Sequence, residues 1–384
     1  MAKYKLGEIC EIVSGSTPKT GIAEYWDGNL KWITPAEIDD ESYIITDSAR
    51  KLTELGVKKT GLSSFPSGTV ILSSRAPIGK VAIAGCEMYC NQGFKNLICS
   101  DRINNRYLYW FLKGNTAYLN SLGRGATFKE ISKKIVSDIE INVPEISQQL
   151  AAVDALERVS EIIRLRKNQL QKLGELIKAR FVEMFGDVIR NSKSWEIRVL
   201  ADIASSRLGK MLDTKQQTGE CSYPYLANFN VQWFRFNTEN LNQMDFNEED
   251  RIEFELQNGD LLVCEGGEIG RCAVWHNEIQ PCFFQKALHR VRCNRQIVHP
   301  DYLGWWFKYN CDHDGFATIA GAKATIAHLP GVKLKQLRVA IPPLELQEQF
   351  AAFVNQTDKS KVVVQKALDE AQLLFDSLMQ KYFG

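Results

Sequence analysis

The chain has 384 residues, of which 45% are hydrophobic and 24% charged, and its 47 basic and 46 acidic residues give a formal net charge of +1. This length and composition are typical of a globular protein with two or three domains, and they argue against a disordered, collagen-like or disulfide-stapled chain. A protein that binds nucleic acid mainly through phosphates usually has a strong basic excess, so the net charge alone does not indicate DNA binding.

The first residues lack the apolar stretch of a signal peptide, and no run approaches the ~18 apolar residues that would cross a membrane. We therefore expect a cytoplasmic protein. The 10 cysteines include no Cys-x-x-Cys pair and no alternation with histidine at zinc spacing. We expect reduced thiols and no metal site.

The two halves of the chain resemble each other. The matched segments, with their offsets, are 68–83 with 259–274 (191), 107–113 with 302–308 (195), 126–128 with 324–326 (198), 149–153 with 349–353 (200) and 184–186 with 382–384 (198). Two copies half a chain apart, with a slowly drifting offset, indicate a duplication with small loop insertions.

Each copy has two parts. Residues 1–143 and 196–341 combine short apolar runs with Gly, Pro, Ser and Asn turns, which is typical of strand-rich α/β domains. Residues 144–195 and 342–384 are strongly periodic, and prolines stand where each periodic segment begins. We predict four regions: domain 1 (1–143), a central helical region (144–195), domain 2 (196–341) and a C-terminal helical region (342–384).

The periodic segments predict two long helices with a narrow coiled-coil seam. Apolar residues recur at alternating steps of 3 and 4, and each seam position of the second helix is a position of the first plus 198. The predicted seam contains Leu156, Val159, Ile163, Leu170, Leu173, Ile177, Val354, Val364, Leu368, Phe375 and Leu378. The expected fold is α+β: two similar domains joined by two long helices, packed as an antiparallel coiled coil with pseudo two-fold symmetry.

The two domains share a hairpin but differ at its tip. Both keep Ile-Gly followed by a basic residue, whereas Ser74-Arg75 in the first copy stands where the second has Glu265-Gly266. One scaffold with two sets of loop side chains suits a protein that reads two different targets. Arginine can bind guanine, glutamate can accept from cytosine, and Asn or Gln can pair with adenine. Drift in a solvent-exposed turn is the alternative for any single residue.

The candidate DNA-binding residues are polar positions near this shared framework. In the first copy they are Ser16, Thr17, Lys19, Ser74, Arg75, Lys80, Asn91, Gln92, Lys95, Arg124, Thr127 and Lys129. In the second copy they are Arg207, Lys210, Asn228, Asn230, Glu265, Arg271, Gln285, Lys286, Lys323 and Thr325. Basic and acidic residues number 18 and 15 in 1–143 but 16 and 18 in 196–342, so further phosphate contacts are expected from partner subunits.

Enzyme motifs are missing from the sequence. There is no Walker phosphate loop, no Gly-x-Gly-x-x-Gly, no Asn-Pro-Pro-Tyr methylation motif, no His-Glu-x-x-His and no nucleophile elbow. We expect no catalytic residue in this chain. A hydrolase built on Cys311 and His313, which have no counterpart in the first copy, is the alternative that would need a catalytic group.

Several motifs together resemble the specificity subunit of type I restriction–modification systems. They are SGSTPKT at 14–20, EYWDG at 24–28, WITP at 32–35, IGK at 78–80, NQGF at 91–94 and IPPLELQEQ at 341–349. The resemblance covers essentially the whole chain. The first copy departs at 143–149, which looks shorter by two residues, and the second copy lacks the Thr-Pro start.

The resemblance implies the function and the partners. Each domain would be a target recognition domain that reads one half of an asymmetric, bipartite double-stranded DNA site, and the helices would set the spacer. The helices would also dock two methyltransferase subunits, and the complex would recruit endonuclease/translocase subunits. S-adenosylmethionine, ATP and Mg would be bound by those partners, so no cofactor is expected here. The alternative is a non-catalytic interaction scaffold, or a decayed copy without sequence-specific DNA binding.

Overall fold

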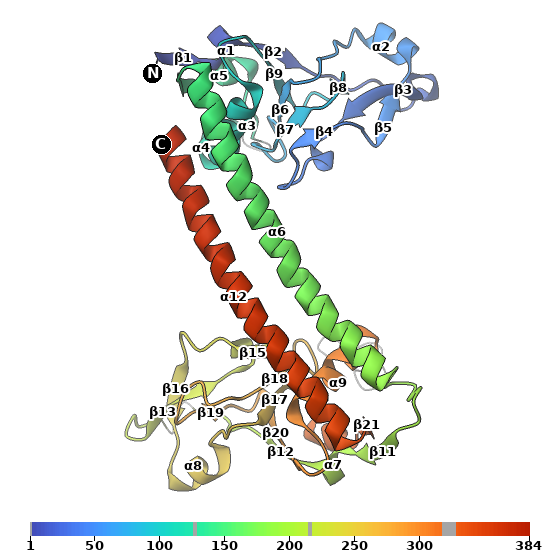
Figure 1. Cartoon of the computed structure of the whole chain (residues 1–384), viewed down its shortest axis with the longest axis vertical. Coiled ribbons are helices and arrows are strands. Elements are labelled where there is room, and N and C mark those ends of the chain that lie inside the picture. The colour runs from blue at the N-terminus through green and yellow to red at the C-terminus, as the bar shows by residue number, and fades with distance from the viewer. Residues whose placement is uncertain (1, 126–128, 214–216, 317–327) are drawn as a thin grey trace. The chain divides into compact units, whose positions relative to one another are not determined.

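The computed structural model describes residues 2–125, 129–213, 217–316 and 328–384 (Figure 1). The chain forms two compact units. The first unit comprises residues 1–168 and 365–384, and the second comprises residues 169–364. Each unit therefore contains one strand-rich part together with segments of both long helices.

The first unit begins with short strands and helices. They are β1 (Ala2–Lys5), α1 (Leu6–Ile9), β2 (Cys10–Ser14), η1 (Ala23–Tyr25), β3 (Trp26–Ile33), η2 (Pro35–Glu37), β4 (Ile44–Ile45), β5 (Arg50–Leu52), α2 (Glu54–Thr60), β6 (Val70–Leu72), β7 (Val81–Ala84), β8 (Tyr89–Cys90), β9 (Lys95–Cys99), α3 (Asn105–Gly114), α4 (Thr116–Ser121), α5 (Lys133–Ser137) and β10 (Glu140–Val143). The strands form a five-stranded sheet in the order β2-β9-β6-β7-β4, a three-stranded sheet β5-β3-β8 and the pair β1-β10.

Helix α3 packs on the five-stranded sheet of the first unit. It starts at Asn104, whose side chain accepts hydrogen bonds from the backbone N–H groups of Arg106 and Tyr107, as at a favourable N-cap. Six consecutive residues of this helix, from Tyr107 to Leu112, are buried. A helix that is apolar around most of its circumference is covered on several sides. Here the sheet covers one side, and apolar residues of both long helices pack on the same core.

The second unit repeats this plan. Its elements are β11 (Glu196–Val199), α7 (Leu200–Ile203), β12 (Ala204–Leu208), β13 (Ser222–Leu226), η4 (Asn228–Asn230), β14 (Val231–Gln232), β15 (Arg235–Phe236), β16 (Asn242–Asp245), α8 (Glu248–Phe254), β17 (Asp260–Cys264), β18 (Cys272–Val274), β19 (Phe283–Phe284), β20 (Leu288–Cys293), α9 (Pro300–Asp312), α11 (Gly331–Lys335) and β21 (Arg338–Ile341). The sheets are β12-β20-β17-β18, β16-β13-β19, β11-β21 and β14-β15. The orders β12-β20-β17-β18 and β2-β9-β6-β7 correspond strand by strand.

Two helices of 40 residues each, α6 (Ile146–Phe185) and α12 (Leu344–Phe383), take part in both units. In the first unit, Val159 and Ile163 of α6 form a cluster with Ala371 of α12. Leu368, Phe375 and Leu378 pack on this cluster. The start of α6 therefore lies beside the end of α12, which is an antiparallel arrangement (Figure 1).

In the second unit the end of α6 packs on the start of α12. Phe181 and Phe185 contact Phe350 edge to face, with ring centroids 5.5 and 5.4 Å apart. Of the remaining predicted seam positions, Leu156, Ile177, Val354 and Val364 are buried, while Leu170 and Leu173 are partly exposed. The predicted α+β class, with two similar strand-rich parts and two antiparallel helices, is confirmed.

A buried glutamine fixes the start of each long helix. The Gln149 side chain donates to the carbonyls of Arg102 (3.0 Å) and Pro144 (2.8 Å) and accepts from the N–H of Asn104 (2.8 Å). In the second unit the Gln347 side chain donates to Ile297 O (3.1 Å) and Pro342 O (2.8 Å) and accepts from His299 N–H (2.8 Å).

These hydrogen bonds correct the sequence alignment at the helix starts. The partner of Gln149 is Gln347, at an offset of 198, and not Gln349, which is exposed. The same offset pairs Val143 with Ile341, so the first copy is not shorter by two residues there. The match at offset 200 was wrong because each helix contains a second glutamine close to the buried one.

Candidate nucleic-acid interface

Three segments of the first unit meet at one edge of the five-stranded sheet. Antiparallel pairing sets Ser14, at the end of β2, opposite Lys95, at the start of β9. The loop after β2 is held by a hydrogen bond from Ser16 N–H to Cys90 O (3.0 Å). The β6–β7 hairpin is held by one from Ser74 N–H to Gly93 O (2.7 Å). Candidate residues from separate stretches of sequence are therefore brought to one edge.

The hairpin turn needs its glycine in both units. Gly79 has φ +94° and Gly270 has φ +80°, a conformation that residues with a Cβ rarely adopt. An added Cβ at Gly79 would also lie 2.9 Å from Cγ2 of Thr116. The turn backbone is thus fixed equally in both copies, while the side chains before it differ.

Glu130 is the centre of a charged cluster at this edge, and sequence reasoning missed it. Its carboxylate lies 3.3 Å from the ammonium of Lys95 and 3.9 Å from the guanidinium of Arg75. Lys95 also donates to the Ser74 hydroxyl at 3.4 Å. Backbone hydrogen bonds join Glu130 to Arg124. A single acidic residue between basic ones gives no sequence pattern, because its partners lie 35 and 55 positions away.

Exposure separates the candidates of the first unit. Ser16, Thr17, Lys19, Gln92, Arg124 and Lys129 are exposed, and Arg75 and Asn91 are partly exposed. Thr17 hydrogen-bonds to Gln92, and the Asn91 side chain accepts from Gly93 N–H at 2.8 Å. Thr127 lies outside the described residues.

Ser74 and Lys95 are buried, with exposed fractions of 0% and 7%. A direct contact between either side chain and DNA would require the loop to open. In this structure the Lys95 side chain links the Ser74 hydroxyl to Glu130, and contact of either residue with DNA stays a prediction. The sequence around Ser74 and Lys95 does not reveal that other segments of the first unit cover these two side chains.

The basic residue after each hairpin glycine also has a structural explanation. The Lys80 ammonium donates to Pro35 O (2.9 Å), and the Arg271 guanidinium donates to Asn228 O (3.1 Å). Pro35 and Asn228 are the first residues of the equivalent 3-10 turns η2 and η4. The shared basic residue therefore ties the hairpin to this turn, which accounts for its presence in both copies.

Asn230 is likewise a structural residue. It is 2% exposed, accepts from Ala227 N–H (2.9 Å) and donates to Asn237 O (3.0 Å). Glu37 accepts from Thr34 N–H (2.8 Å) at the equivalent turn of the first unit. In this structure Asn230 closes the turn, and its contact with a base stays a prediction.

Three cations at the corresponding edge of the second unit, Arg207, Lys210 and Arg271, are paired with carboxylates. Arg207 lies 2.5 Å from Glu253, and Lys210 lies 2.5 Å from Asp250. Arg271 lies 3.4 Å from Glu268. Each pair reduces the positive potential that the cation would offer to a phosphate, as the pairing with Glu130 does for Lys95 and Arg75 in the first unit.

The other candidates of the second unit surround the same hairpin. Asn228 donates to Gly266 O at 2.9 Å, and the backbone of Glu265 bonds to Ala287 and Leu329. Gln285 is partly exposed and Lys286 exposed, and the backbone of Lys286 bonds to Lys210 O at 2.9 Å. Lys323 and Thr325 lie outside the described residues.

Phe229 is a surface residue at this edge that sequence reasoning missed. It stands in the middle of η4, between Asn228 and Asn230, and is 59% exposed. Its equivalent in the first unit is Ala36. An aromatic ring between two asparagines in a turn was the available signal. Exposed apolar side chains can contact a thymine methyl group or a base step.

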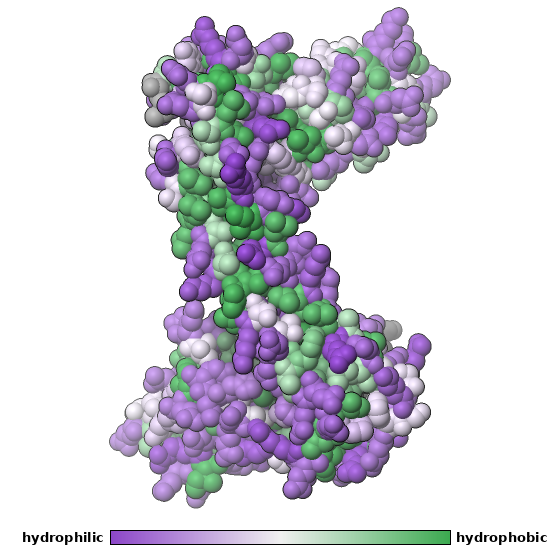
Figure 2. All heavy atoms as spheres, viewed as in Figure 1, coloured by the Kyte–Doolittle hydropathy of each residue, from purple (hydrophilic) through white to green (hydrophobic). Residues whose placement is uncertain are grey.

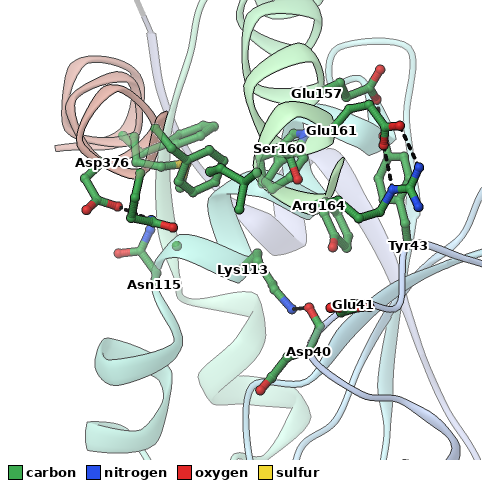
Figure 3. A pocket seen from close by; sticks show the side chains of 18 of the residues that line it. Asp40, Glu41, Tyr43, Lys113, Asn115, Glu157, Ser160, Glu161, Arg164 and Asp376 are labelled. Atoms are coloured by element: carbon green, nitrogen blue, oxygen red, sulfur yellow. Dashed lines mark hydrogen bonds and ion pairs between the residues drawn. The ribbon is translucent and has the colours of Figure 1, made fainter. Parts of the chain in front are cut away.

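A second feature of the first unit is a cavity of about 870 Å³ beside the long helices (Figure 3). It lies against α3, α6 and α12, and the loop before β4 closes another side. Its walls combine aromatic rings, such as Tyr109, Trp110 and Phe375, with carboxylates, such as Glu157 and Asp376. Figure 3 shows Lys113 reaching across it toward Asp40.

Burial perturbs two groups that line the cavity. Burial, with a hydrogen bond to the Glu157 carboxylate, raises the pKa of the Tyr43 hydroxyl above its usual range. Burial lowers the pKa of Lys113, whose ammonium donates to Asp40 O at 2.7 Å. Glu161 pairs with Arg164 at 2.6 Å. The cavity is therefore mixed in charge, and most of its ionised groups already have partners.

The equivalent site in the second unit is almost filled. Tyr309 stands where the first unit has Gly114, and Phe181 stands where it has Met379. The Tyr309 and Phe181 rings lie 5.8 Å apart, and the cavity there is about 50 Å³. In the first unit the end of the Met379 side chain covers Gly114, and both residues line the larger cavity.

The long helices also expose apolar side chains. Leu373 is 71% exposed and Leu374 51%, while Val362 and Val363 are both 70% exposed. On the face shown in Figure 2, green residues gather over the helical segments, and the strand-rich parts are mainly purple. Large exposed apolar patches can mark interaction sites.

The described part of the chain shows neither a candidate metal cluster nor a membrane-spanning helix. Residues 2–125, 129–213, 217–316 and 328–384 contain no cluster of His, Cys, Asp and Glu suited to a metal ion. Within the same residues, no helix has the length and apolarity needed to cross a membrane.

Comparison with known proteins points to one family. The family model described as "Type I restriction modification DNA specificity domain" matches residues 1–175 and 192–371. The type I restriction enzyme MjaIX specificity subunit of Methanocaldococcus jannaschii is 36% identical over 223 residues, which is 53% of this chain and 52% of that subunit. The chain thus spans about half the length of this relative.

Solved structures agree on the fold. The S subunit of the type I restriction–modification system from M. genitalium aligns with a TM-score of 0.62 at 15% identity, over 100% of this chain and 96% of that one. A structure described in terms of complex assembly and conformational transition of the type I R-M system gives a TM-score of 0.62 at 16% identity, over 100% and 97%.

Proposed function

Because the chain belongs to the family of the type I restriction modification DNA specificity domain, we propose that it gives a type I restriction–modification complex its DNA sequence specificity. Each strand-rich part reads one half of an asymmetric, bipartite double-stranded site. One observation carries this proposal. The two β-hairpins share their glycine turn and the basic tie to a 3-10 turn, but Ser74-Arg75 in one is Glu265-Gly266 in the other.

Exposure and charge distinguish the proposed reading edges of the two units. In the first unit, exposed Lys19, Arg124 and Lys129 supply cations, and Thr17 and Gln92 supply hydrogen-bonding groups. In the second unit, Lys286 and Phe229 are exposed, while Arg207 and Lys210 are neutralised by carboxylates. Phosphate contacts set affinity and base contacts set sequence, so the second edge would read its half-site with little phosphate affinity of its own.

The partners follow from the helices. We propose that α6 and α12 dock two methyltransferase subunits, supported by the exposed apolar residues of α12 and by the cavity beside it. Endonuclease/translocase subunits would join this assembly. S-adenosylmethionine, ATP and Mg would be bound by those partners, and this chain would be non-catalytic and act in the cytoplasm.

Footprinting tests the reading function. The chain is assembled with its methyltransferase subunits, and protected DNA is selected from a random pool. The expected result is one split site with two different halves. Protection independent of sequence would overturn the proposal. If affinity also showed no dependence on salt, a protein-interaction scaffold would be favoured, because phosphate contacts release counterions.

Docking is tested separately from reading. Leu373→Glu places a charge on a side chain that is 71% exposed, so the fold of the chain should persist. Methyltransferase binding should weaken at least about tenfold, a loss typical of an apolar contact at the centre of an interface. Lys381→Glu, at an exposed position of the same helix, is the control. If Leu373→Glu bound the methyltransferase as tightly as the wild-type chain does, Leu373 would be excluded from the docking surface.

A further inference from the structure

Two cysteines of the first unit face each other across neighbouring strands. The register of β2 and β9 sets Cys10 directly opposite Cys99. The next pair along the ladder, Ile9 and Ser100, is joined by a backbone hydrogen bond from Ser100 N–H to Ile9 O (2.9 Å). Hydrogen-bonded and non-hydrogen-bonded pairs alternate in an antiparallel ladder. Cys10 and Cys99 are therefore a non-hydrogen-bonded pair.

This type of pair has the closest side chains in a sheet. Its Cα atoms are typically about 4.5 Å apart, and a disulfide accepts Cα separations from about 4.4 to 6.8 Å. Its Cβ atoms are about 4.5 to 5.5 Å apart, slightly more than a relaxed disulfide prefers. A bond here would need a small closure of the two strands.

The two side chains also point the same way. Cys10 is part of the main apolar core of the first unit, and Cys99 packs against that core. A hydrogen bond to Cys99, together with burial, raises the pKa of the Cys10 thiol. Both cysteines are free thiols in this structure. Cys99 is partly exposed, so a small oxidant can reach it, whereas Cys10 is 7% exposed.

We propose that Cys10 and Cys99 form an oxidisable dithiol site that reversibly ties β2 to β9. The oxidant is a low-molecular-weight disulfide. The Cys99 thiolate attacks one of its sulfurs and displaces one thiol. The Cys10 sulfur then attacks the Cys99 sulfur of the mixed disulfide, loses its proton and displaces the second thiol. Two protein thiols are oxidised to one disulfide, and one small disulfide is reduced to two thiols.

The site lies where it can affect the reading edge. β2 is an edge strand of the five-stranded sheet, paired on one side only, with β9. It leads directly into the loop that carries Ser16, Thr17 and Lys19. A covalent tie at Cys10 would restrict the opening of this strand. The inference does not depend on the proposed function, because it concerns the sheet itself.

The second unit provides a matched control within the same chain. The equivalent register sets Ala204 opposite Cys293, and Asn294 N–H bonds to Ile203 O at 2.8 Å. The backbone ladder is thus the same, but one of the two thiols is missing. Substitution Ala204→Cys would complete the pair.

The experiment treats the full chain with oxidised glutathione, alkylates it in denaturant and identifies crosslinked peptides by mass spectrometry. Wild-type protein should lose the Cys10 and Cys99 thiols together and give a peptide that links them, which a dithiol reductant reverses. In the Cys10→Ser variant, Cys99 should carry a glutathione adduct and form no link to another peptide. The Ala204→Cys variant should gain a link from position 204 to Cys293.

Two results would overturn the proposal. One is wild-type protein in which both thiols stay alkylatable, or carry separate adducts, while the Ala204→Cys variant forms its link. The other is hydrogen exchange of the β2 amides that does not slow when the link between Cys10 and Cys99 forms, because the bond would then not tie the strand.

Discussion

At the residue scale, a single amide side chain explains how each long helix is joined to its strand-rich part. Gln149 and Gln347 are both 0% exposed, and each makes three hydrogen bonds to backbone groups of two separate loops. A buried amide with all its partners is stable, but the backbone groups would be left unsatisfied without it. Each glutamine therefore joins the start of its long helix to the backbone of the strand-rich part.

Substitution Gln149→Leu should destabilise the first unit. It leaves the carbonyls of Arg102 and Pro144 and the N–H of Asn104 without a partner, and each buried unsatisfied group costs about 1–3 kcal/mol. We expect the free energy of unfolding to fall by about 3 kcal/mol or more, measured by urea denaturation. Gln148→Leu, at an exposed neighbouring position, is the control. A loss no larger than that of the control would show that the hydrogen bonds of Gln149 do not stabilise the first unit.

Substitution Phe229→Ala should weaken reading of the second half-site. The ring is 59% exposed, so its removal should leave the free energy of unfolding almost unchanged. If it contacts a base, binding of the assembled complex should weaken about tenfold, since a specific base contact is worth ~1–3 kcal/mol. Ile197→Ala, 42% exposed on the strand pair that closes the unit, is the control. Unchanged affinity for the cognate site would exclude Phe229 from the interface.

How much of the reading edge could be predicted depends on what a single residue reveals about its surroundings. Lys19 and Arg124 were named from their polar character near a turn, and both are exposed. Lys95 and Asn230 have the same character but are buried, because segments distant in sequence fold over them. Glu130 and Phe229 were missed for the converse reason. Their importance comes from neighbours that only the fold brings together.

At the element scale, the long helices were predictable because their signal is local. Apolar residues at most positions of an alternating three- and four-residue step indicate a helix with a seam, whatever it packs against. The cavity of the first unit was not predictable, because it arises between elements. Its lining includes Gly114 of α3 and Met379 of α12, where the second unit has Tyr309 and Phe181.

The helices offer a test of the proposed spacer. The contacts at the two ends of the pair, in one unit between Ile163 and Ala371 and in the other between Phe185 and Phe350, set residues 170–176 of α6 opposite residues 358–364 of α12. Deleting both segments removes one heptad from each helix and preserves the phase of the seam. Each helix shortens by roughly 10 Å, at ~1.5 Å per residue.

The double deletion should change the preferred spacer between the two half-sites and leave both half-sites unaltered. The measurement is the spacer length selected by the assembled complex from a pool in which only the spacer varies. Deletion of 170–176 alone, which leaves the partner helix at full length, is the comparison and should destabilise the pair. Selection of the original spacer with full affinity would contradict the role of the helices as a ruler.

At the scale of the whole chain, the net charge of +1 reflects two strand-rich parts of different electrostatic character. In the first, Lys19, Arg124 and Lys129 are exposed at the candidate edge. In the second, the equivalent edge holds its main cations in ion pairs with carboxylates. A duplicated protein with unequal edges suits a division of labour in which partner subunits supply much of the phosphate affinity.

Exchange of one strand-rich part should therefore change one half-site only. Residues 1–143 begin and end in the strand pair β1-β10, where Ala2 pairs with Val143, and 196–341 begin and end in the equivalent pair β11-β21. Each segment thus closes on its own hydrogen bonds and can be replaced at these boundaries by the corresponding segment of a relative. The replacement must retain the apolar face that packs on Phe375, Leu378 and Phe383 of α12.

The measurement is methylation mapping in cells that express the exchanged chain with its cognate methyltransferase. Replacing 1–143 should give sites in which one half is new and the other is unchanged, because the second reading edge and both helices are intact. Replacing 196–341 should change the complementary half and provides the internal control. A chain in which either exchange altered both halves would show that the two edges read DNA jointly, and the one-domain, one-half-site assignment would fall.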